Sequence, residues 1–216
     1  MPQSRLKRLL DVTVAALALA VFAVPMAVVA VAIRCTMGRP VLFRQVRPGR
    51  ARKPFNLCKF RTMSDACDPQ GRLLPDRARL TRLGRFLRAT SLDELPQLLN
   101  VLRGDMSLVG PRPLLCRYLP YFTDRESIRF DVRPGITGWA QIHGRNRVAW
   151  DDRLELDAWY VEHWSLALDL RILAQTVAAV FARRGTVVDP SSLMLDLDAE
   201  RASRMPRNRD AHCAAC

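Results

Sequence analysis

The chain has 216 residues and a formal net charge of +13. This length accommodates one ordinary domain with additional segments and excludes two large domains. The positive excess is confined to the first 90 residues, which hold 18 Lys and Arg against 4 Asp and Glu, whereas the remainder holds 16 against 17. A positive field concentrated in this way attracts anionic lipid, phosphate or nucleic acid. Only three of the 34 basic residues are Lys, and a compositional bias of this kind explains the choice of Arg but not its placement.

An uncharged apolar segment runs from Val12 to Ile33. As a helix, its 22 residues extend roughly 33 Å, enough to cross a hydrocarbon core of about 30 Å, and the segment is too long for a cleaved signal peptide. Pro25 lies inside it and favours a break, so we expect a re-entrant membrane helix with both ends on one side; a kinked spanning helix is the alternative. Basic residues flank both ends, so the positive-inside rule gives no orientation: Arg5, Lys7, Arg8, Arg34, Arg39 and Arg44.

The segment from Val41 to Met63 alternates apolar and basic residues around Pro48-Gly49. This pattern predicts a short β-hairpin with one basic face. Lys59 and Arg61, two residues apart, would then point the same way, either as part of a binding site or as a solvated strand face.

Helical spacing of apolar residues follows in three segments. Two of them, Leu80 to Leu87 and Leu92 to Leu102, are separated by Ala89-Thr90-Ser91, and the third runs from Leu166 to Phe181. The fold class predicted is therefore α+β, mainly helical, with a small hairpin. We expect an anchor at residues 1–38, a core at residues 39–185 and a flexible tail at residues 186–216.

The tail carries two weak metal-binding patterns. Asp196-x-Asp198 is similar to the metal-binding pair of many glycosyltransferases, and Cys213-x-x-Cys216 is the only paired spacing among six cysteines. His212 lies beside the cysteine pair and could add a metal ligand, but the surrounding tail is expected to be flexible. The cysteines therefore predict a reduced cytoplasmic compartment rather than a zinc site.

The segment Arg88-Ala-Thr-Ser-Leu-Asp-Glu-Leu-Pro contains two adjacent acids, Asp93 and Glu94. Ser91 and Glu94 have the spacing of a capping box, which predicts a helix start that holds Asp93 ionised and accommodates phosphate. An ionised aspartate beside a bound diphosphate can act as a nucleophile toward phosphorus, and Glu94 can hold Mg²⁺. On this pattern alone, the two acids could equally serve only to complement the helix dipole.

A second group of residues, Gly104 to Pro113, presents Arg112 between two prolines. The prolines restrict the backbone, and a guanidinium binds phosphate as a bidentate fork. Arg88 is a candidate for a second phosphate-binding guanidinium. Each arginine on its own could also be an ordinary surface residue in a loop.

Three blocks, KFRTM, SLDELPQLLNVLRGDMSLVGPRP and RPGITGWAQIHGR, resemble the signatures of the bacterial monotopic phosphoglycosyl transferases, closest to the small PglC-type members. The resemblance covers roughly residues 5 to 185. It implies a re-entrant helix, interfacial amphipathic helices and a site at the cytoplasmic face of the bacterial inner membrane. It also implies a covalent phosphosugar on Asp93, Mg²⁺ on Glu94, and phosphate contacts from Lys59, Arg88, Arg112 and Lys7, with Arg61 as a further candidate from the hairpin.

The implied reaction takes a sugar 1-phosphate from a UDP-sugar, releases UMP and passes the phosphosugar to undecaprenyl phosphate. An N-acetylated amino sugar is the expected sugar, and a homodimer or an assembly with downstream glycosyltransferases is a further expectation. The sequence departs from the family at the membrane bend, where Val24 precedes Pro25 in place of the family's frequent Ser.

Three other classes of function were weighed. A nucleic-acid-binding membrane protein would also be basic, but aromatic residues make up 7% of the chain and no docking motif is present, so no nucleic acid partner is expected. A metal-dependent glycosyltransferase that moves the sugar alone would release UDP instead of UMP. A non-enzymatic scaffold would not depend on Asp93.

Overall fold

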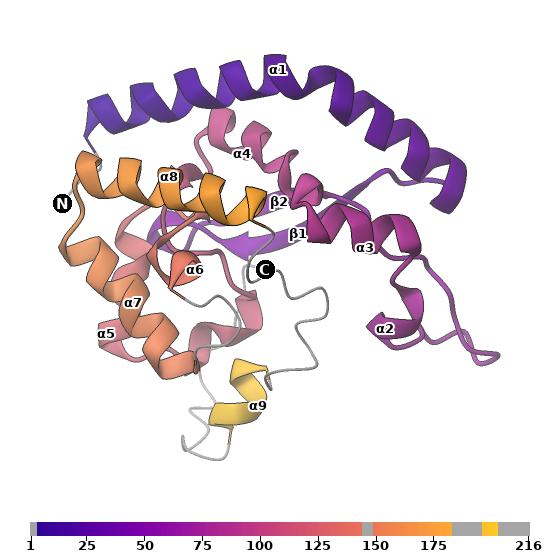
Figure 1. Cartoon of the computed structure of the whole chain (residues 1–216). Coiled ribbons are helices and arrows are strands. Elements are labelled where there is room, and N and C mark those ends of the chain that lie inside the picture. The colour runs from indigo at the N-terminus through magenta and orange to yellow at the C-terminus, as the bar shows by residue number, and fades with distance from the viewer. Residues whose placement is uncertain (1–3, 144–148, 183–195, 203–216) are drawn as a thin grey trace.

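A single long helix, α1 (Arg5–Met37), lies along one side of the molecule, and the other elements pack beneath it (Figure 1). The structure is a computed structural model that describes residues 4–143, 149–182 and 196–202. By length and composition, α1 is the one helix in these ranges that could cross a membrane. The predicted break at Pro25 is absent, because α1 continues past the proline as a curved helix. A bend relieves the clash that a proline ring makes with the preceding turn.

The predicted hairpin is confirmed. Strands β1 (Leu42–Pro48) and β2 (Pro54–Phe60) pair antiparallel, with Phe43 opposite Lys59, and the short 3-10 turn Arg50–Arg52 joins them. A second, parallel pair consists of β3 (Ser107–Val109) and β4 (Gly135–Thr137). This second pair lies outside the sequence predictions, since three-residue strands leave no periodic pattern.

Helices make up most of the remaining described structure, as predicted. The helix expected from Leu166 to Phe181 is α8 (Leu166–Phe181), and the helices expected before and after Ser91 are α3 (Arg82–Ala89) and α4 (Gln97–Arg103). The other helices are α2 (Asp76–Arg79), α5 (Asp124–Ser127), α6 (Trp139–Ile142), α7 (Trp150–Glu162) and α9 (Leu197–Arg201). Further 3-10 turns occur at Leu92–Glu94, Cys116–Tyr121 and Ile128–Asp131.

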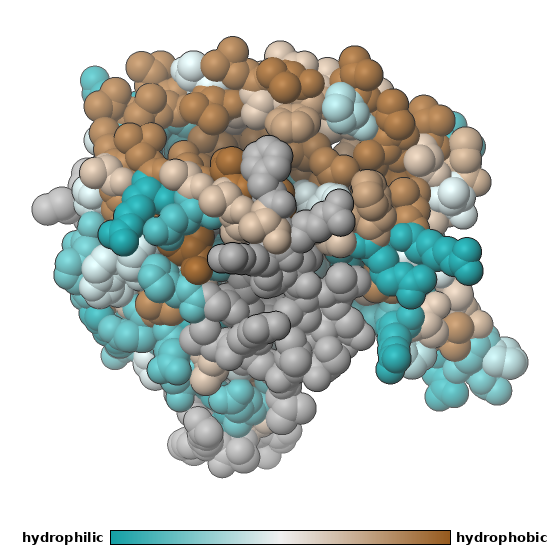
Figure 2. Space-filling view, in the orientation of Figure 1, coloured by the Kyte–Doolittle hydropathy of each residue, from teal (hydrophilic) through white to brown (hydrophobic). Residues whose placement is uncertain are grey.

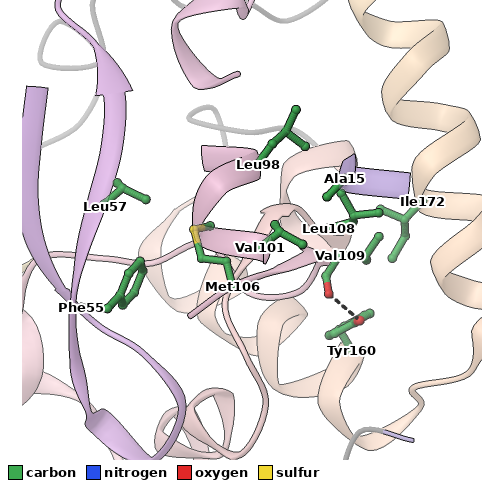
Figure 3. Close-up of a cluster of buried hydrophobic side chains, with 10 residues drawn as sticks. All are labelled: Ala15, Phe55, Leu57, Leu98, Val101, Met106, Leu108, Val109, Tyr160 and Ile172. Atoms are coloured by element: carbon green, nitrogen blue, oxygen red, sulfur yellow. Dashed lines mark hydrogen bonds between the residues drawn. The ribbon is translucent and has the colours of Figure 1, made fainter. Parts of the chain in front are cut away.

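The main hydrophobic core lies between the hairpin, α4, β3 and the two helices α7 and α8 (Figure 3). Helix α1 contributes Ala15 to this core, and α8 contributes Ile172, both fully buried. A second cluster near the far end of α1 contains Val29 and Ile33 together with Phe60 and Leu87. Both ends of α1 are therefore packed against the same body of the protein.

Between these contacts, α1 exposes a continuous apolar surface (Figure 2). Exposed apolar side chains also occur along α8, at Leu170, Val177 and Val180. A soluble monomer rarely exposes large apolar patches, so this surface indicates a membrane or a partner. The exposed apolar residues of α1 are Leu6, Leu9, Leu10, Val14, Leu17, Val21, Phe22, Val24, Val28 and Val31.

Part of the segment expected to be a flexible tail is a packed helix, so that expectation is wrong for residues 196–202. Leu197 of α9 is fully buried in a cluster with Leu114, Tyr118 and Trp150. The buried Arg201 donates to Glu126 at 2.6 and 2.7 Å. The composition of the tail is polar, but one leucine and one arginine supply enough burial and pairing to order this turn. The cysteine pattern at Cys213 and Cys216 lies outside the described residues.

Replacing Leu197 with Ala tests whether α9 is packed in this way. A Leu→Ala change at a buried site lowers the free energy of unfolding by roughly 2–5 kcal/mol, because apolar contacts are lost and a cavity remains. Urea unfolding of the detergent-solubilised chain, followed by tryptophan fluorescence, measures the loss. Ala202→Ser is the matched control on the exposed side, expected to change stability by no more than about 0.5 kcal/mol. Equal stability of the two variants would contradict the packing of α9.

Candidate active site

Asp93 and Glu94 lie in the 3-10 turn Leu92–Glu94, between α3 and α4. Ser91 precedes them in a left-handed backbone conformation (φ 57°, ψ 16°) and makes no side-chain capping hydrogen bond. The predicted capping box is therefore wrong. A left-handed non-glycine residue is uncommon and strained. Of the two acids that follow it, Asp93 is buried and Glu94 is half-buried. Helix α4 itself begins at Gln97, after Pro96.

Two cations bind the same oxygen of Glu94. Lys59 Nζ lies 2.6 Å and Arg112 Nη2 lies 2.7 Å from Glu94 Oε1. Lys59 comes from β2 and Arg112 from the loop after β3, so three separate segments meet at one carboxylate. Charge-assisted hydrogen bonds of this length are about twice as strong as neutral ones. Because both contacts use Oε1, they leave Oε2 as the oxygen that can accept another ligand.

The position of Lys59 depends on a fully buried amide. Asn100 of α4 accepts a hydrogen bond from the Cys58 backbone N–H at 3.1 Å and donates one to the Asn56 carbonyl at 2.8 Å. These bonds fasten β2 to α4 one residue before Lys59. Asn100 therefore fixes the position of β2, which carries Lys59, relative to α4, which follows the acidic turn.

Arg88 is placed by a close approach of α3 to the chain after β2. A Cβ atom added to Gly84 would lie 1.9 Å from the Thr62 carbonyl oxygen, so only glycine permits this packing. Because α3 lies this close to Thr62, Arg88 Nε can donate a hydrogen bond to Thr62 Oγ1, at 3.1 Å. The positive charge of Arg88 acts on Asp93, where it lowers the pKa of the carboxyl group.

Burial of Asp93, which is 8% exposed, and the neighbouring charge of Glu94 raise the pKa of Asp93 to about 6. Lys59, Arg112 and Arg88 oppose this shift. Burial also acts to raise the pKa of Glu94, but the Arg112 and Lys59 charges outweigh it and hold that pKa well below its usual value. The expectation that a helix start keeps Asp93 ionised needs correction: surrounding cations keep it ionised at neutral pH, against the effect of burial.

Two residues predicted to contact phosphate make other contacts. Arg61 is 7% exposed and donates to Met63 O at 2.9 Å and to Arg39 O at 3.1 Å, near the end of α1. Lys7 is 2% exposed and pairs with Asp169 Oδ2 at 2.6 Å. The structure therefore brings together Lys59, Arg88, Asp93, Glu94 and Arg112, and it uses Arg61 and Lys7 to attach α1.

The Lys7 contact belongs to a buried polar network that the sequence analysis missed. Asp169 also accepts a hydrogen bond from Trp164 at 3.1 Å. The single hydroxyl proton of Tyr160 is shared between Asp169 Oδ1, at 2.7 Å, and the Val109 carbonyl, at 3.2 Å (Figure 3 shows the Val109 contact). Lys7 donates to the same carbonyl at 3.2 Å. Val109 ends β3, three residues before Arg112. In the sequence, Asp169 stands out as an acid on the apolar side of the helix predicted at residues 166–181, which indicates a buried partner. That partner, Lys7, lies 162 positions away and could not be identified from the sequence.

The described residues contain no group of three or more His, Cys, Asp or Glu side chains arranged to hold a metal ion. Asp93 and Glu94 remain as adjacent carboxylates, a donor set that suits Mg²⁺ when substrate phosphates complete its coordination. The Asp196 and Asp198 carboxylates of the tail instead pair with Arg117, and Asp196 also accepts from Tyr118 at 2.8 Å.

Comparison with known proteins identifies sugar transferases. A family profile described as bacterial sugar transferase matches residues 2–183. The uncharacterized sugar transferase EpsL of Bacillus subtilis is 55% identical over 83% of this chain and 89% of its own length. A UDP-glucose:undecaprenyl-phosphate glucose-1-phosphate transferase of Caulobacter vibrioides is 44% identical over 81% of this chain and 69% of its own length. A UDP-N-acetylgalactosamine-undecaprenyl-phosphate N-acetylgalactosaminephosphotransferase of Aeromonas hydrophila is 38% identical over 83% of this chain and 44% of its own length.

The charge arrangement predicts how the pKa of Asp93 responds to substitution. Glu94→Gln removes a neighbouring negative charge and leaves Lys59 and Arg112 to act on Asp93, so the pKa of Asp93 falls below about 6. A pH titration of ¹³C-labelled Asp carboxyl groups, with the signal assigned through Asp93→Asn, measures the shift. Glu155→Gln, at an exposed position, is the control and leaves the pKa unchanged. An Asp93 pKa that rises in Glu94→Gln would contradict this account of the site.

Proposed function

This chain belongs to the bacterial sugar transferase family and is a phosphoglycosyl transferase, and we propose that it transfers a sugar 1-phosphate from a UDP-sugar to undecaprenyl phosphate through a covalent intermediate on Asp93. The observation that carries the proposal is a buried aspartate surrounded by three cations, at a turn where two of those cations are shared with a second carboxylate. Three cations against two acids leave a net positive charge, which favours binding of a diphosphate. A buried carboxylate is also a stronger nucleophile than a hydrated one.

In the first step, an Asp93 carboxylate oxygen attacks the β-phosphorus of the UDP-sugar. The new bond joins this oxygen to phosphorus, the bond from phosphorus to the bridging oxygen breaks, and UMP leaves with that oxygen. In the second step, an oxygen of undecaprenyl phosphate attacks the same phosphorus, and the acyl-phosphate bond breaks. Asp93 is regenerated as a carboxylate, and the product is a polyprenyl diphosphate sugar.

The cations have different parts in this scheme. Lys59 and Arg112 already bind Glu94, so they are held in place before substrate arrives, and preorganised charge stabilises a transition state without reorganisation at the moment of reaction. Arg88 acts directly on Asp93. Glu94 would hold Mg²⁺ together with the substrate, and the ion would neutralise charge that develops on the leaving UMP.

The packing of α1 supports a re-entrant helix at the cytoplasmic face of the inner membrane. Lys7 near its start and Ile33 near its end both contact the body that carries the active site. A helix that crossed the bilayer would place those ends on opposite sides. The exposed apolar sides of α1 and α8 then lie in one leaflet, so that both helices are interfacial and the site meets the lipid phosphate at the headgroup level.

The sugar itself stays a prediction. Two of the relatives reported above are named for the sugar that they transfer, glucose in one and N-acetylgalactosamine in the other. We keep an N-acetylated amino sugar as the proposed substrate, and the similarity to PglC-type members also stays a prediction.

Replacing Asp93 with Asn tests the proposed chemistry. The amide is a poor nucleophile, so UMP release falls by at least roughly three orders of magnitude, whereas Asp152→Asn, at an exposed acid, retains activity. UDP-sugars labelled in the β-phosphate, including UDP-N-acetylgalactosamine and UDP-glucose, are supplied to the purified enzyme, and mass spectrometry searches for a phosphosugar on the peptide that contains Asp93. Release of UDP in place of UMP would establish transfer of the sugar alone and reject the proposal.

The pH dependence of kcat/KM follows from the pKa of Asp93. The reactive form is the carboxylate, and burial raises its pKa to about 6, so kcat/KM declines as the pH falls through about 6 and is constant above it. Initial rates of UMP release between pH 5 and about 8 measure the profile. A kcat/KM that stays constant down to about pH 5, as for an ordinary Asp with a pKa of about 4, would contradict the buried nucleophile.

Cysteine labelling tests the membrane arrangement. Arg5→Cys and Arg39→Cys are introduced separately, both at exposed positions, into a variant without native cysteines. In inverted membrane vesicles, both react with a membrane-impermeant maleimide if α1 is re-entrant. Protection of either cysteine until the vesicles are opened indicates a spanning helix.

A further inference from the structure

A buried arginine contacts the main chain of Arg112 from outside the site described above. Arg129 lies in the 3-10 turn Ile128–Asp131 and is 4% exposed. Its Nη2 atom donates to the carbonyl oxygen of Arg112 at 2.6 Å. The same atom lies 3.0 Å from Asp157 Oδ2 on α7, and both side chains of this pair are 3% exposed.

Burial makes this ion pair expensive. Two charges taken out of water recover their desolvation cost only when the geometry is good and the remaining polar atoms are satisfied. Arg129 Nη1 and Asp157 Oδ1 have no hydrogen-bond partner among the described residues. An apolar pair of similar volume would stabilise the fold as well as this ion pair or better, so stability alone does not account for the two charges. What an apolar pair could not provide is the hydrogen bond to the Arg112 carbonyl.

Two aromatic rings restrict where the Arg129 guanidinium can lie. Its central carbon is 5.3 Å from the centre of the Phe122 ring and 5.8 Å from that of Phe130. The guanidinium is thus held by an acid, two rings and one carbonyl oxygen, and Arg129 has little freedom to follow a displaced Arg112.

The main chain at Arg112 is restrained on its other sides as well. Pro111 and Pro113 fix the backbone angles of its neighbours. Gly110 packs so closely that an added Cβ atom would lie 2.4 Å from the Arg133 carbonyl oxygen. Arg129 supplies the remaining restraint, on the carbonyl group of the residue whose side chain binds Glu94.

We propose that Arg129 and Asp157 are positioning residues of this transferase: the buried pair holds the Arg112 carbonyl and thereby keeps the Arg112 guanidinium on Glu94. The catalytic consequence rests on the proposed function. A displacement of about 1 Å in a group that stabilises the transition state can reduce the rate on the order of 100-fold, so the effect falls mainly on kcat.

The test uses full-length enzyme in nanodiscs that contain undecaprenyl phosphate. Arg129→Met/Asp157→Asn removes both charges of the pair together. Arg153, whose charge also acts on Asp157, keeps its contact with the Trp150 ring, and the melting temperature of the variant shows whether it folds. We expect kcat for UMP release to fall on the order of 10- to 100-fold with a smaller change in KM, and Arg129→Lys with native Asp157 to recover part of the loss. The matched control is Arg201→Met/Glu126→Gln, a buried pair with side chains 7% and 9% exposed, which lowers the melting temperature and retains kcat.

A double-mutant cycle separates positioning from general destabilisation. If the pair acts through Arg112, adding its replacement to Arg112→Met causes no further loss of kcat. Three outcomes would each overturn the proposal: fold-losses in kcat that multiply when the two changes are combined, an unchanged kcat in the folded pair variant, or an equal loss of kcat in the control.

Hydrogen exchange of the peptide spanning residues 110–115 is a readout independent of turnover. Exchange accelerates in the pair variant if Arg129 restrains this segment. An enzyme that releases no UMP but shows this acceleration would reject the proposed function and keep the positioning.

Discussion

The shared oxygen of Glu94 is the contact on which the arrangement of the site depends. It joins β2, the acidic turn and the loop after β3, which are separated by 35 and 18 positions in the chain. If Glu94 were not bound in this way, Lys59 and Arg112 would be two half-buried like charges without an acid between them. Because it is, both cations are in place next to Asp93 without substrate, and a carboxylate that burial would otherwise neutralise stays charged at neutral pH.

Each of the three segments has its own restraint behind it. Asn100 holds β2, Gly84 allows α3 to approach Thr62, and Arg129 holds the chain at Arg112. None of these residues is among those proposed to bind substrate. The reactive groups are thus supported by a surrounding layer of buried polar contacts, as expected where charges must keep their positions in a region with little water.

Sequence reasoning could propose the reactive residues as one group because the motifs that carry them are local. Asp93, Glu94 and Arg112 lie within 20 positions of one another, and the hairpin that carries Lys59 has a clear alternating pattern. The same reasoning placed Arg61 beside Lys59, but β2 ends at Phe60, and the chain then turns toward the end of α1. The spacing of Ser91 and Glu94 suggested a capping box, which a left-handed serine and a carboxylate already bound by two cations exclude.

Contacts between distant segments were beyond sequence reasoning for a physical reason. Lys7 finds Asp169, and Asp11 accepts a hydrogen bond from the Leu108 backbone N–H at 3.1 Å; no periodic pattern links such positions. Each partner is an ordinary residue in its own segment. Only the packed arrangement of α1 against β3 and α8 gives these side chains a buried partner.

The Lys7 contact also constrains how the protein is made. Among the described elements α1 is synthesised first, with the Lys7 ammonium next to the most apolar part of the chain, yet Asp169 is translated 162 residues later. Until then the ammonium lacks the carboxylate that it pairs with in the folded protein, and hydration at the bilayer surface is the less costly state for a charge without that partner. The start of the anchor can therefore reach its final depth only after the globular part is nearly complete, so that insertion and tertiary folding conclude as one event.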